Sequence, residues 1–326
     1  MHKAILCSIL AGLSGLAPMA ARAQSYPSRP IELVVPLAPG STTDVAARLL
    51  AQRVSQTLGA QVVVENKPGA GSMLGSAAVA KAAPDGHTLL MGAIGLAINP
   101  LLYKTVPYDT ERDFAPVSLL LTTPMIMLVN PSVGVRSLRE FLVKYKGSQD
   151  LSYASAGPGT LPQLSGVLFK VKSGIALRHV PYKGGAQALN DTIAGHVQIN
   201  FGTPVTKPVI DAGKVLALAV AAPRRVATLP NVPTFAEEGL PIPELDAGAW
   251  FGILAPAGTA KEIVQKLSQH FNDALKYPAV QEQLQTLGLV ARGTTPEEFA
   301  RFLHEEIERW PPIFARAGIG RSGEAQ

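Results

Sequence analysis

The sequence is poor in cysteine and in charged residues. Among its 326 residues there is one cysteine, Cys7, and Asp, Glu, Lys and Arg together make up 16%. Cys7 lies in an amino-terminal segment that we expect to be removed, so the mature chain is predicted to form no disulfide and no catalytic thiolate. Hydrophobic residues make up 47%, which permits a large core and argues against intrinsic disorder.

Signatures of several function classes are also missing. Lysine and arginine are scattered, without a basic run interleaved with aromatic residues, which argues against nucleic-acid binding. The histidines at 87, 179, 196, 270 and 304 show no metal-ligand spacing. The segment 69–75 approaches a dinucleotide fingerprint, but it has one residue too many before its last glycine, and no Walker sequence occurs. We therefore predict no metal and no cofactor.

The first residues have the pattern of a secretory signal. Met1–Lys3 carry positive charge, residues 4–16 are apolar or small, and Ala21-Arg22-Ala23 fits a small-x-small cleavage site. This apolar run is too short to span a bilayer, and no later apolar stretch is long enough to do so. We predict a cleavable signal peptide over residues 1–23. Its removal takes away Lys3 and Arg22 and lowers the formal net charge from +5 to +3 (5 − 2).

A strand–loop–helix arrangement occurs twice. Residues 31–35 are β-branched and typical of a buried strand, and residues 45–58 carry apolar side chains at helical spacing. Residues 151–154 and 161–172 repeat this pattern after a second loop of small residues. Two such loops facing one cleft would hold an anion between helix N-termini. The alternative is a pair of ordinary capped turns, which every α/β protein contains.

The rest of the sequence continues the alternation of strand and helix patterns, which predicts βαβ units and a mostly parallel sheet. Apolar runs at 114–121 and 125–130 are split by Thr122-Thr123-Pro124. The further predicted strands are 61–65, 87–92, 197–201, 215–221 and 250–256. The further predicted helices are 74–83, 137–146, 186–194, 261–275, 279–287 and 296–310.

Residues 153–157, Tyr-Ala-Ser-Ala-Gly, are similar to the nucleophile elbow of serine hydrolases. That motif begins with glycine, and a tyrosine side chain would crowd its sharp turn. A secreted hydrolase would combine Ser155 with Asp191 and with His179 or His196. Because a triad is defined by geometry, this alternative stays open, although we prefer a hydrogen-bonding role for Ser155. A third alternative is a protein-interaction module without a small-molecule ligand.

Several short blocks occur in a characteristic order along almost the whole chain. They are residues 26–31, 39–44, 64–71, 80–86, 113–117, 179–184, 229–234 and 250–252. In these blocks, from about residue 26 to residue 319, the chain resembles the substrate-binding proteins of tripartite tricarboxylate transporters, the Bug receptor family. A series of blocks in the right order is more specific than any single motif.

The resemblance implies an α/β fold of two domains, a periplasmic binding protein similar to type II, with the ligand cleft between the domains. We expect domain 1 to comprise 26–122 plus 251–326, and domain 2 to comprise 123–250. Such a receptor is a monomer that closes over a small organic acid. It then presents the acid to membrane permease subunits, or serves in sensing. It uses no cofactor and is not an enzyme.

The resemblance also implies that two loops hold the ligand carboxylate, largely through backbone N–H groups and water. Both loops lack Lys and Arg, so helix dipoles and amides would replace ion pairs. The residues expected to bind ligand are Leu37, Gly40, Ser41, Thr42, Thr43, Asp44, Gly95, Ser155, Ala156, Gly157, Gly159, Thr160, Gly184, Gly202 and Thr203.

Some of these positions depart from the family pattern. Leu37 replaces a common aromatic residue, Ser41 replaces a glycine, and Gly202 stands where an aspartate is frequent. Pro158 removes one N–H donor from the second loop. A carboxylate at Asp44 would repel an anion, so we interpret this residue chiefly as a helix cap.

Overall fold

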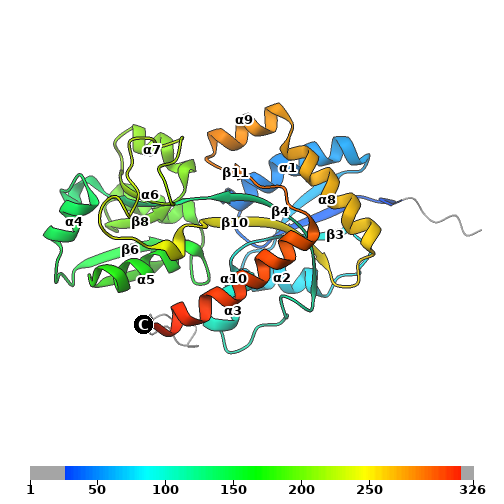
Figure 1. Cartoon of the computed structure of the whole chain (residues 1–326), viewed down its shortest axis with the longest axis horizontal. Helices are drawn as coiled ribbons and strands as arrows, with labels where there is room; N and C mark the ends of the chain where they lie inside the picture. Colours follow the sequence, from blue (N-terminus) through cyan, green and yellow to red (C-terminus); the bar gives the residue numbers. More distant parts are fainter. Residues whose placement is uncertain (1–25, 317–326) are drawn as a thin grey trace, which may run out of the picture.

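Two separate β-sheets divide the molecule, as Figure 1 shows. The computed structural model describes residues 26–316, so the predicted signal peptide and Cys7 lie outside the described residues. The first sheet, called sheet A, has the strand order β11 (Val290–Ala291), β4 (Phe114–Thr123), β10 (Ala249–Pro256), β3 (Thr88–Gly92), β1 (Ile31–Val35) and β2 (Val62–Asn66). The second, called sheet B, has the order β7 (Leu177–Pro181), β6 (Leu151–Ser155), β8 (Ile199–Gly202), β5 (Met125–Val129) and β9 (Leu216–Ala221).

Helices cover both faces of sheet A. One face packs Leu33 and Leu50 with Phe271, and the other packs Leu90 with Trp310, all of them fully buried. Alternate strand residues therefore face opposite layers, as the two-residue period of a strand requires. The helices of this half are α1 (Thr42–Leu58), α2 (Met73–Ala80), α3 (Gly95–Leu102), α8 (Lys261–Leu275), α9 (Pro278–Thr286) and α10 (Pro296–Arg316).

Sheet B is also covered by helices. Phe201 packs with Leu168 and Phe169 on one face, and Ile126 and Leu128 belong to a separate cluster. The helices of this half are α4 (Leu138–Lys144), α5 (Leu161–Ser173), α6 (Gly185–Ala194) and α7 (Lys207–Asp211). Short 3-10 turns lie at η1 (Pro131–Val133), η2 (Pro204–Thr206) and η3 (Pro243–Leu245).

Both sheets contain the same parallel trio of strands. In sheet A, β1 lies between β2 and β3 and is parallel to both. In sheet B, β6 lies between β7 and β8 and is parallel to both. An antiparallel strand follows in each, β10 beside β3 and β5 beside β8. In open sheets of this kind, ligands bind beyond the carboxyl ends of the strands, where the strand order reverses.

The chain passes between the sheets at two adjacent points. It leaves sheet A after β4 at Pro124, and it returns through Gly248 before β10. Gly248 has a φ of 67°, and a β-carbon there would collide with the carbonyl group of Thr123. The two crossings therefore pack directly against each other, and only glycine fits at this contact.

The structure corrects four expectations. In place of the expected mostly parallel sheet, both sheets are mixed, because β4, β5, β9, β10 and β11 pair antiparallel. Strands β7 and β11 were not predicted. β7 has only five residues, Leu-Arg-His-Val-Pro, and β11 has only two, so neither carries a clear strand pattern. The helix expected at 45–58 begins at Thr42, because Ser41 caps it. The helix expected to end at Trp310 continues through Pro311 and Pro312 to Arg316. Its last turns bury Ile313 and Phe314 in the core, and this burial offsets the backbone hydrogen bonds that proline removes.

Candidate functional site

A cavity of about 330 Å³ lies between the two sheets. Its walls come from the loops that follow β1, β2 and β3 in sheet A, and from the segments that follow β6, β7 and β8 in sheet B. The first residues of β10, where the chain returns to sheet A, complete the lining. The cavity thus occupies the place where the carboxyl ends of both parallel trios meet, and its size suits a small ligand.

Most of the residues expected to bind ligand lie together in this cavity. The expected residues that line it are Leu37, Gly40, Ser41, Thr42, Thr43, Gly95, Ser155, Ala156, Gly159, Thr160, Gly202 and Thr203. Asp44, Gly157 and Gly184 are adjacent in sequence to lining residues but do not line the cavity themselves.

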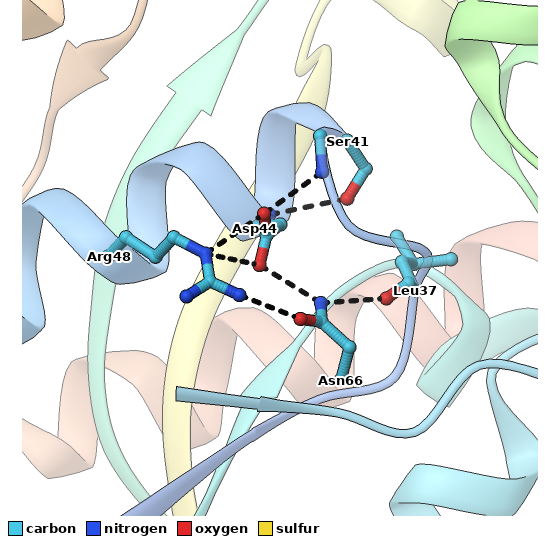
Figure 2. Close-up of polar contacts among 6 residues, drawn as sticks. Leu37, Ser41, Asp44, Arg48 and Asn66 are labelled. Carbon is cyan, nitrogen blue, oxygen red and sulfur yellow. Dashed lines mark hydrogen bonds and ion pairs between the residues drawn. The ribbon is translucent and has the colours of Figure 1, made fainter. Parts of the chain in front are cut away.

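Asp44 does not line the cavity, and its contacts, drawn in Figure 2, organise the first loop. Its carboxylate accepts hydrogen bonds from the Gly40 amide at 2.9 Å, from Asn66 Nδ2 at 2.9 Å and from Arg48 Nε at 3.0 Å. Its own amide donates to Ser41 Oγ, so Ser41 caps α1, while the Asp44 carboxylate holds the loop residue before the cap. Burial alone would raise the pKa of Asp44, but these donors outweigh burial and lower it.

Gly157 and Gly184 shape the loops of sheet B. The Gly157 amide donates to Ser155 Oγ at 3.1 Å, and its φ of 108° strongly favours glycine. Gly184 is the N-cap of α6, and a β-carbon there would lie 3.6 Å from the β-carbon of Ala38 in the opposite half. Both residues support the cavity from behind its surface.

Several helices begin at the cavity without a side chain to cap them. The N-cap residues of α3, α5 and α6 are Ile94, Thr160 and Gly184, and the side chain of none of them accepts a hydrogen bond from its helix. Residues of the first turn of each of these helices line the cavity. The positive ends of three helix dipoles therefore face the same space, which favours an anion there. In α3, the Leu96 and Ala97 amides already donate to the carbonyl groups of Ala93 and Ile94.

The lining contains no charged side chain among the described residues. Its polar side chains are Ser41, Thr42, Thr43, Ser72, Ser155, Thr160, Asn200, Thr203 and Thr206. Its larger apolar side chains are Leu37, Ile94, Met125, Leu161, Leu189, Phe201, Val205, Trp250 and Phe251. The cavity can thus hold an anion by hydroxyl and amide hydrogen bonds while an apolar body lies against hydrocarbon.

Sequence reasoning missed part of this lining. Gly71 and Ser72 follow β2, and Ala93 follows β3, so the rule that ligands bind beyond parallel strands could have indicated them. Trp250 and Phe251 were assigned to a strand but not to the site. No local signal marks them, because they reach the cavity only through the return of the chain to sheet A.

Ser155 pairs with a histidine but does not form a triad. Ser155 Oγ lies 2.7 Å from His179 Nε2, and burial lowers the pKa of His179 to about 4. Asp191 instead accepts a hydrogen bond from Tyr182 Oη at 2.6 Å and lies 3.7 Å from His196. Across residues 26–316, no carboxylate contacts His179 to orient it as a base.

The two halves touch at the cavity rim. Thr42 Oγ1 lies 3.4 Å from Thr203 Oγ1, and a β-carbon on Gly159 would lie 3.5 Å from the α-carbon of Gly71.

Within the described part of the chain, no cluster of three metal-binding side chains occurs. In the same part, no helix has the length and apolar character needed to cross a membrane.

Comparisons with known proteins agree with this geometry. Residues 46–319 match the family described as the tripartite tricarboxylate transporter family receptor. Protein BugT of Bordetella pertussis is 36% identical over 300 residues, which cover 91% of this chain and 91% of BugT.

Two solved structures share the fold. The periplasmic binding protein BugD is 36% identical with a TM-score of 0.85, and the match covers 90% of this chain and 99% of BugD. Rpa4515 of R. palustris, solved with adipate, is 34% identical with a TM-score of 0.86, covering 90% of this chain and 99% of that protein. The predicted binding-protein fold and the family resemblance are both confirmed. The chain belongs to the tripartite tricarboxylate transporter receptor family, which consists of solute-binding proteins and not of enzymes.

Proposed function

We propose that this chain binds a small organic carboxylate in the cavity between its sheets. The observation that carries the proposal is the combination of three uncapped helix N-termini with a lining that holds no charged side chain among its described residues. Such a site stabilises an anion through fixed backbone dipoles. The adipate in the related Rpa4515 supports a carboxylate as that anion.

The carboxylate would be held from both halves. From sheet A, the first turn of α1 offers the Thr42 and Thr43 amides; no described residue accepts from either of them. From sheet B, the loop after β6 offers the hydroxyl of Thr160 and the first turn of α5. Each half supplies donors that the other lacks, so the full set exists only when the halves are close.

The wider role follows the family. We assign 26–122 plus 251–326 to one domain and 123–250 to the other, with the crossings at Pro124 and Gly248 as the hinge. After removal of the predicted signal peptide, the receptor would act in the periplasm, since the related BugD is a periplasmic binding protein. We expect this chain to act there as a monomer. It would pass its ligand to permease subunits of a tripartite transporter, or serve in sensing.

Thermal unfolding against a panel of carboxylates, each with its matched amide, tests the binding proposal. A ligand at one hundred times its dissociation constant should stabilise the protein by about 2.7 kcal/mol, a rise of several degrees in Tm. The amides should give no shift, since they lack the charge. Equal shifts for an acid and its amide, or a flat response to the whole panel, would contradict the proposal.

A pair of variants at Ala156 tests the location. Ala156 is a half-buried residue of the cavity wall beside the N-terminus of α5. Ala156→Asp places a negative charge there, whereas Ala156→Asn adds nearly the same volume without charge. We expect Asp to weaken carboxylate binding at least tenfold more than Asn does. Equal effects of the two variants would place the ligand elsewhere.

A further inference from the structure

We propose that Gly288 is a positioning residue for the ligand cavity, although it lies outside the cavity lining. Its bare α-carbon is the surface against which Pro204 of the other half rests, and this contact allows the two halves to come together. The inference rests on the domain closure of the proposed function, and it does not depend on which carboxylate is bound.

Gly288 and Pro204 meet across the boundary between the two halves. Gly288 lies between α9 and β11 in the half with sheet A, and Pro204 begins η2 in the half with sheet B. A β-carbon on Gly288 would lie 2.0 Å from Cβ and 2.6 Å from Cγ of Pro204. Both distances are far below van der Waals contact, so no side chain fits at position 288 while the halves have this arrangement.

The turn that carries Gly288 is fixed within its own half. The Gly288 amide donates to the Gln285 carbonyl group at 2.9 Å, and the Gly288 carbonyl group accepts from Thr123 Oγ1 at 3.0 Å. The next residue, Leu289, is buried and donates its amide to the Leu284 carbonyl group at 2.8 Å. A shift of this turn would break these hydrogen bonds, so the turn does not easily move aside.

Pro204 is held in the other half, directly beside the cavity. Its ring is closed on the backbone and cannot rotate away as a flexible side chain could. The Thr203 carbonyl group accepts from the amide of Thr206 at 3.0 Å and from its hydroxyl at 2.7 Å, which fixes η2 around the proline. The residues around the proline, Thr203, Val205 and Thr206, line the cavity. The contact with Gly288 therefore supports one wall of the cavity from behind.

A methyl group at position 288 would push the two halves apart, because both partners of the contact are anchored. Thr203 directly precedes Pro204, and its Oγ1 lies 3.4 Å from Thr42 Oγ1 across the rim. Separation at Pro204 would therefore also separate these two hydroxyls and draw η2 away from the lining that sheet A contributes. Glycine at position 288 permits closure, and a larger residue opposes it.

A disulfide across the rim measures closure without any ligand. Cys7 is the only cysteine and lies in the predicted signal peptide, so a chain that begins at residue 24 has no other thiol. In Thr42→Cys/Thr203→Cys, the two sulfur atoms can join only when the halves are together. The rate of cross-linking under mild oxidation then reports the closed fraction. In this background, we expect Gly288→Ala to lower the rate at least tenfold.

Gly59→Ala is the matched control for the backbone conformation. Gly59 ends α1 in the same half with a φ of 73°, against 65° for Gly288, but a β-carbon on Gly59 meets nothing within 4 Å. This variant should leave the cross-linking rate within twofold of the parent.

Replacement of the partner residue tests whether the effect passes through the contact. Pro204→Gly removes the ring and its β-carbon, so Gly288→Ala should lower the rate less than threefold in that background. Pro204→Ala keeps the β-carbon that lies 2.0 Å from the added methyl group, so it should give no such relief.

The cross-linking rates decide the inference. Equal rates for Gly288→Ala and Gly59→Ala, or a fall that Pro204→Gly does not relieve, overturn it. If Gly288→Ala does not fold, Pro204→Gly alone is decisive, because loss of the ring should slow cross-linking at least threefold and an unchanged rate overturns the inference. If the parent cysteine pair never cross-links, the halves do not close at this rim, and the inference fails together with the proposed closure.

Isothermal titration of the cysteine-free variants separates this inference from the carboxylate proposal. The probes are adipate and every other acid of the panel that stabilises the wild type. Gly288→Ala should weaken their binding at least tenfold more than Gly59→Ala does, and equal affinities of the two variants overturn the inference. If the cross-linking rates follow the expected pattern while no acid binds the wild type, the inference stands and the carboxylate proposal fails.

Discussion

Replacement of Asp44 by asparagine should destabilise the fold strongly while leaving the ligand site largely in place. Three donors converge on the buried carboxylate, namely the Gly40 amide, Asn66 Nδ2 and Arg48 Nε. The single acceptor oxygen of asparagine cannot satisfy all of them. Each buried donor left without an acceptor costs about 1–3 kcal/mol. Because the Arg48 side chain is 53% exposed and can turn to water, we expect a total loss of about 2–4 kcal/mol.

The assay is urea unfolding at several pH values, which measures the free energy of unfolding. The control is Arg48→Met, which removes the exposed partner of Asp44 and should cost at most about 1 kcal/mol. The pKa of Asp44 is lower in the folded chain than its ordinary value. Its stabilisation is therefore present above about pH 4 and is lost as the pH falls through the folded pKa. The gap between wild type and Asp44→Asn should shrink in acid. A stable variant that has lost ligand binding a hundredfold would refute the capping role and place Asp44 in the binding set.

Three further changes test other parts of the structure, each by urea unfolding. Burial lowers the pKa of His179 from 6.5 to about 4, so wild type should lose stability as the pH falls from about 6.5 to 4, and His179→Gln should lose less. Glu306 accepts from Trp250 Nε1 at 2.9 Å and pairs with Arg309, and burial raises its pKa. Both Glu306→Gln and Glu306→Leu remove the ion pair, but only Glu306→Leu also leaves the indole unpaired, so it should cost about 1–3 kcal/mol more than Glu306→Gln. Gly213→Ala should cost about 1–2 kcal/mol, because its only effect is left-handed backbone strain. Gly248→Ala should cost well over that amount, because its β-carbon would also strike the carbonyl group of Thr123. Equal costs of the two variants would rule out a tight crossing.

The local elements were predictable where a segment carries its own signals. Residues 31–35 are β-branched, and α1 ends at Gly59, which has the expected left-handed conformation. By contrast β7 reads Leu-Arg-His-Val-Pro, and it becomes a strand only because β6 pairs along its whole length. The extension of α10 beyond Pro311 depends on Ile313 and Phe314, which are buried in the hydrophobic core, and no local pattern reveals that burial.

The two principal loops of the site were predictable from the sequence. The prediction of the remaining lining residues also required the topology of the fold. The loops after β1 and β6 are marked in sequence by small residues between a strand and a helix, and both line the cavity. Ser72 and Leu189 reach it only because α2 and α6 begin beside those loops in space. The interpretation of Asp44 as a structural residue of the first loop agrees with its contacts. Ser155 and His179 form the pair that a hydrolase would need, but no described carboxylate orients His179.

In the closure that we propose, the division of donors between the sheets would couple ligand binding to closure. Helices α1 and α3 belong to the half with sheet A, and α5 and α6 belong to the half with sheet B. A form with the halves apart would present only part of the N–H set to a carboxylate, so the ligand would bind the closed form more tightly. A ligand shifts such an equilibrium by its difference in affinity for the two forms. The donors are backbone groups fixed at helix ends. Closure would therefore change the distance between the donors of the two halves, while the conformation of each helix end stays the same. The rim contact between Thr42 and Thr203 would be one of the points at which the two halves meet on closure.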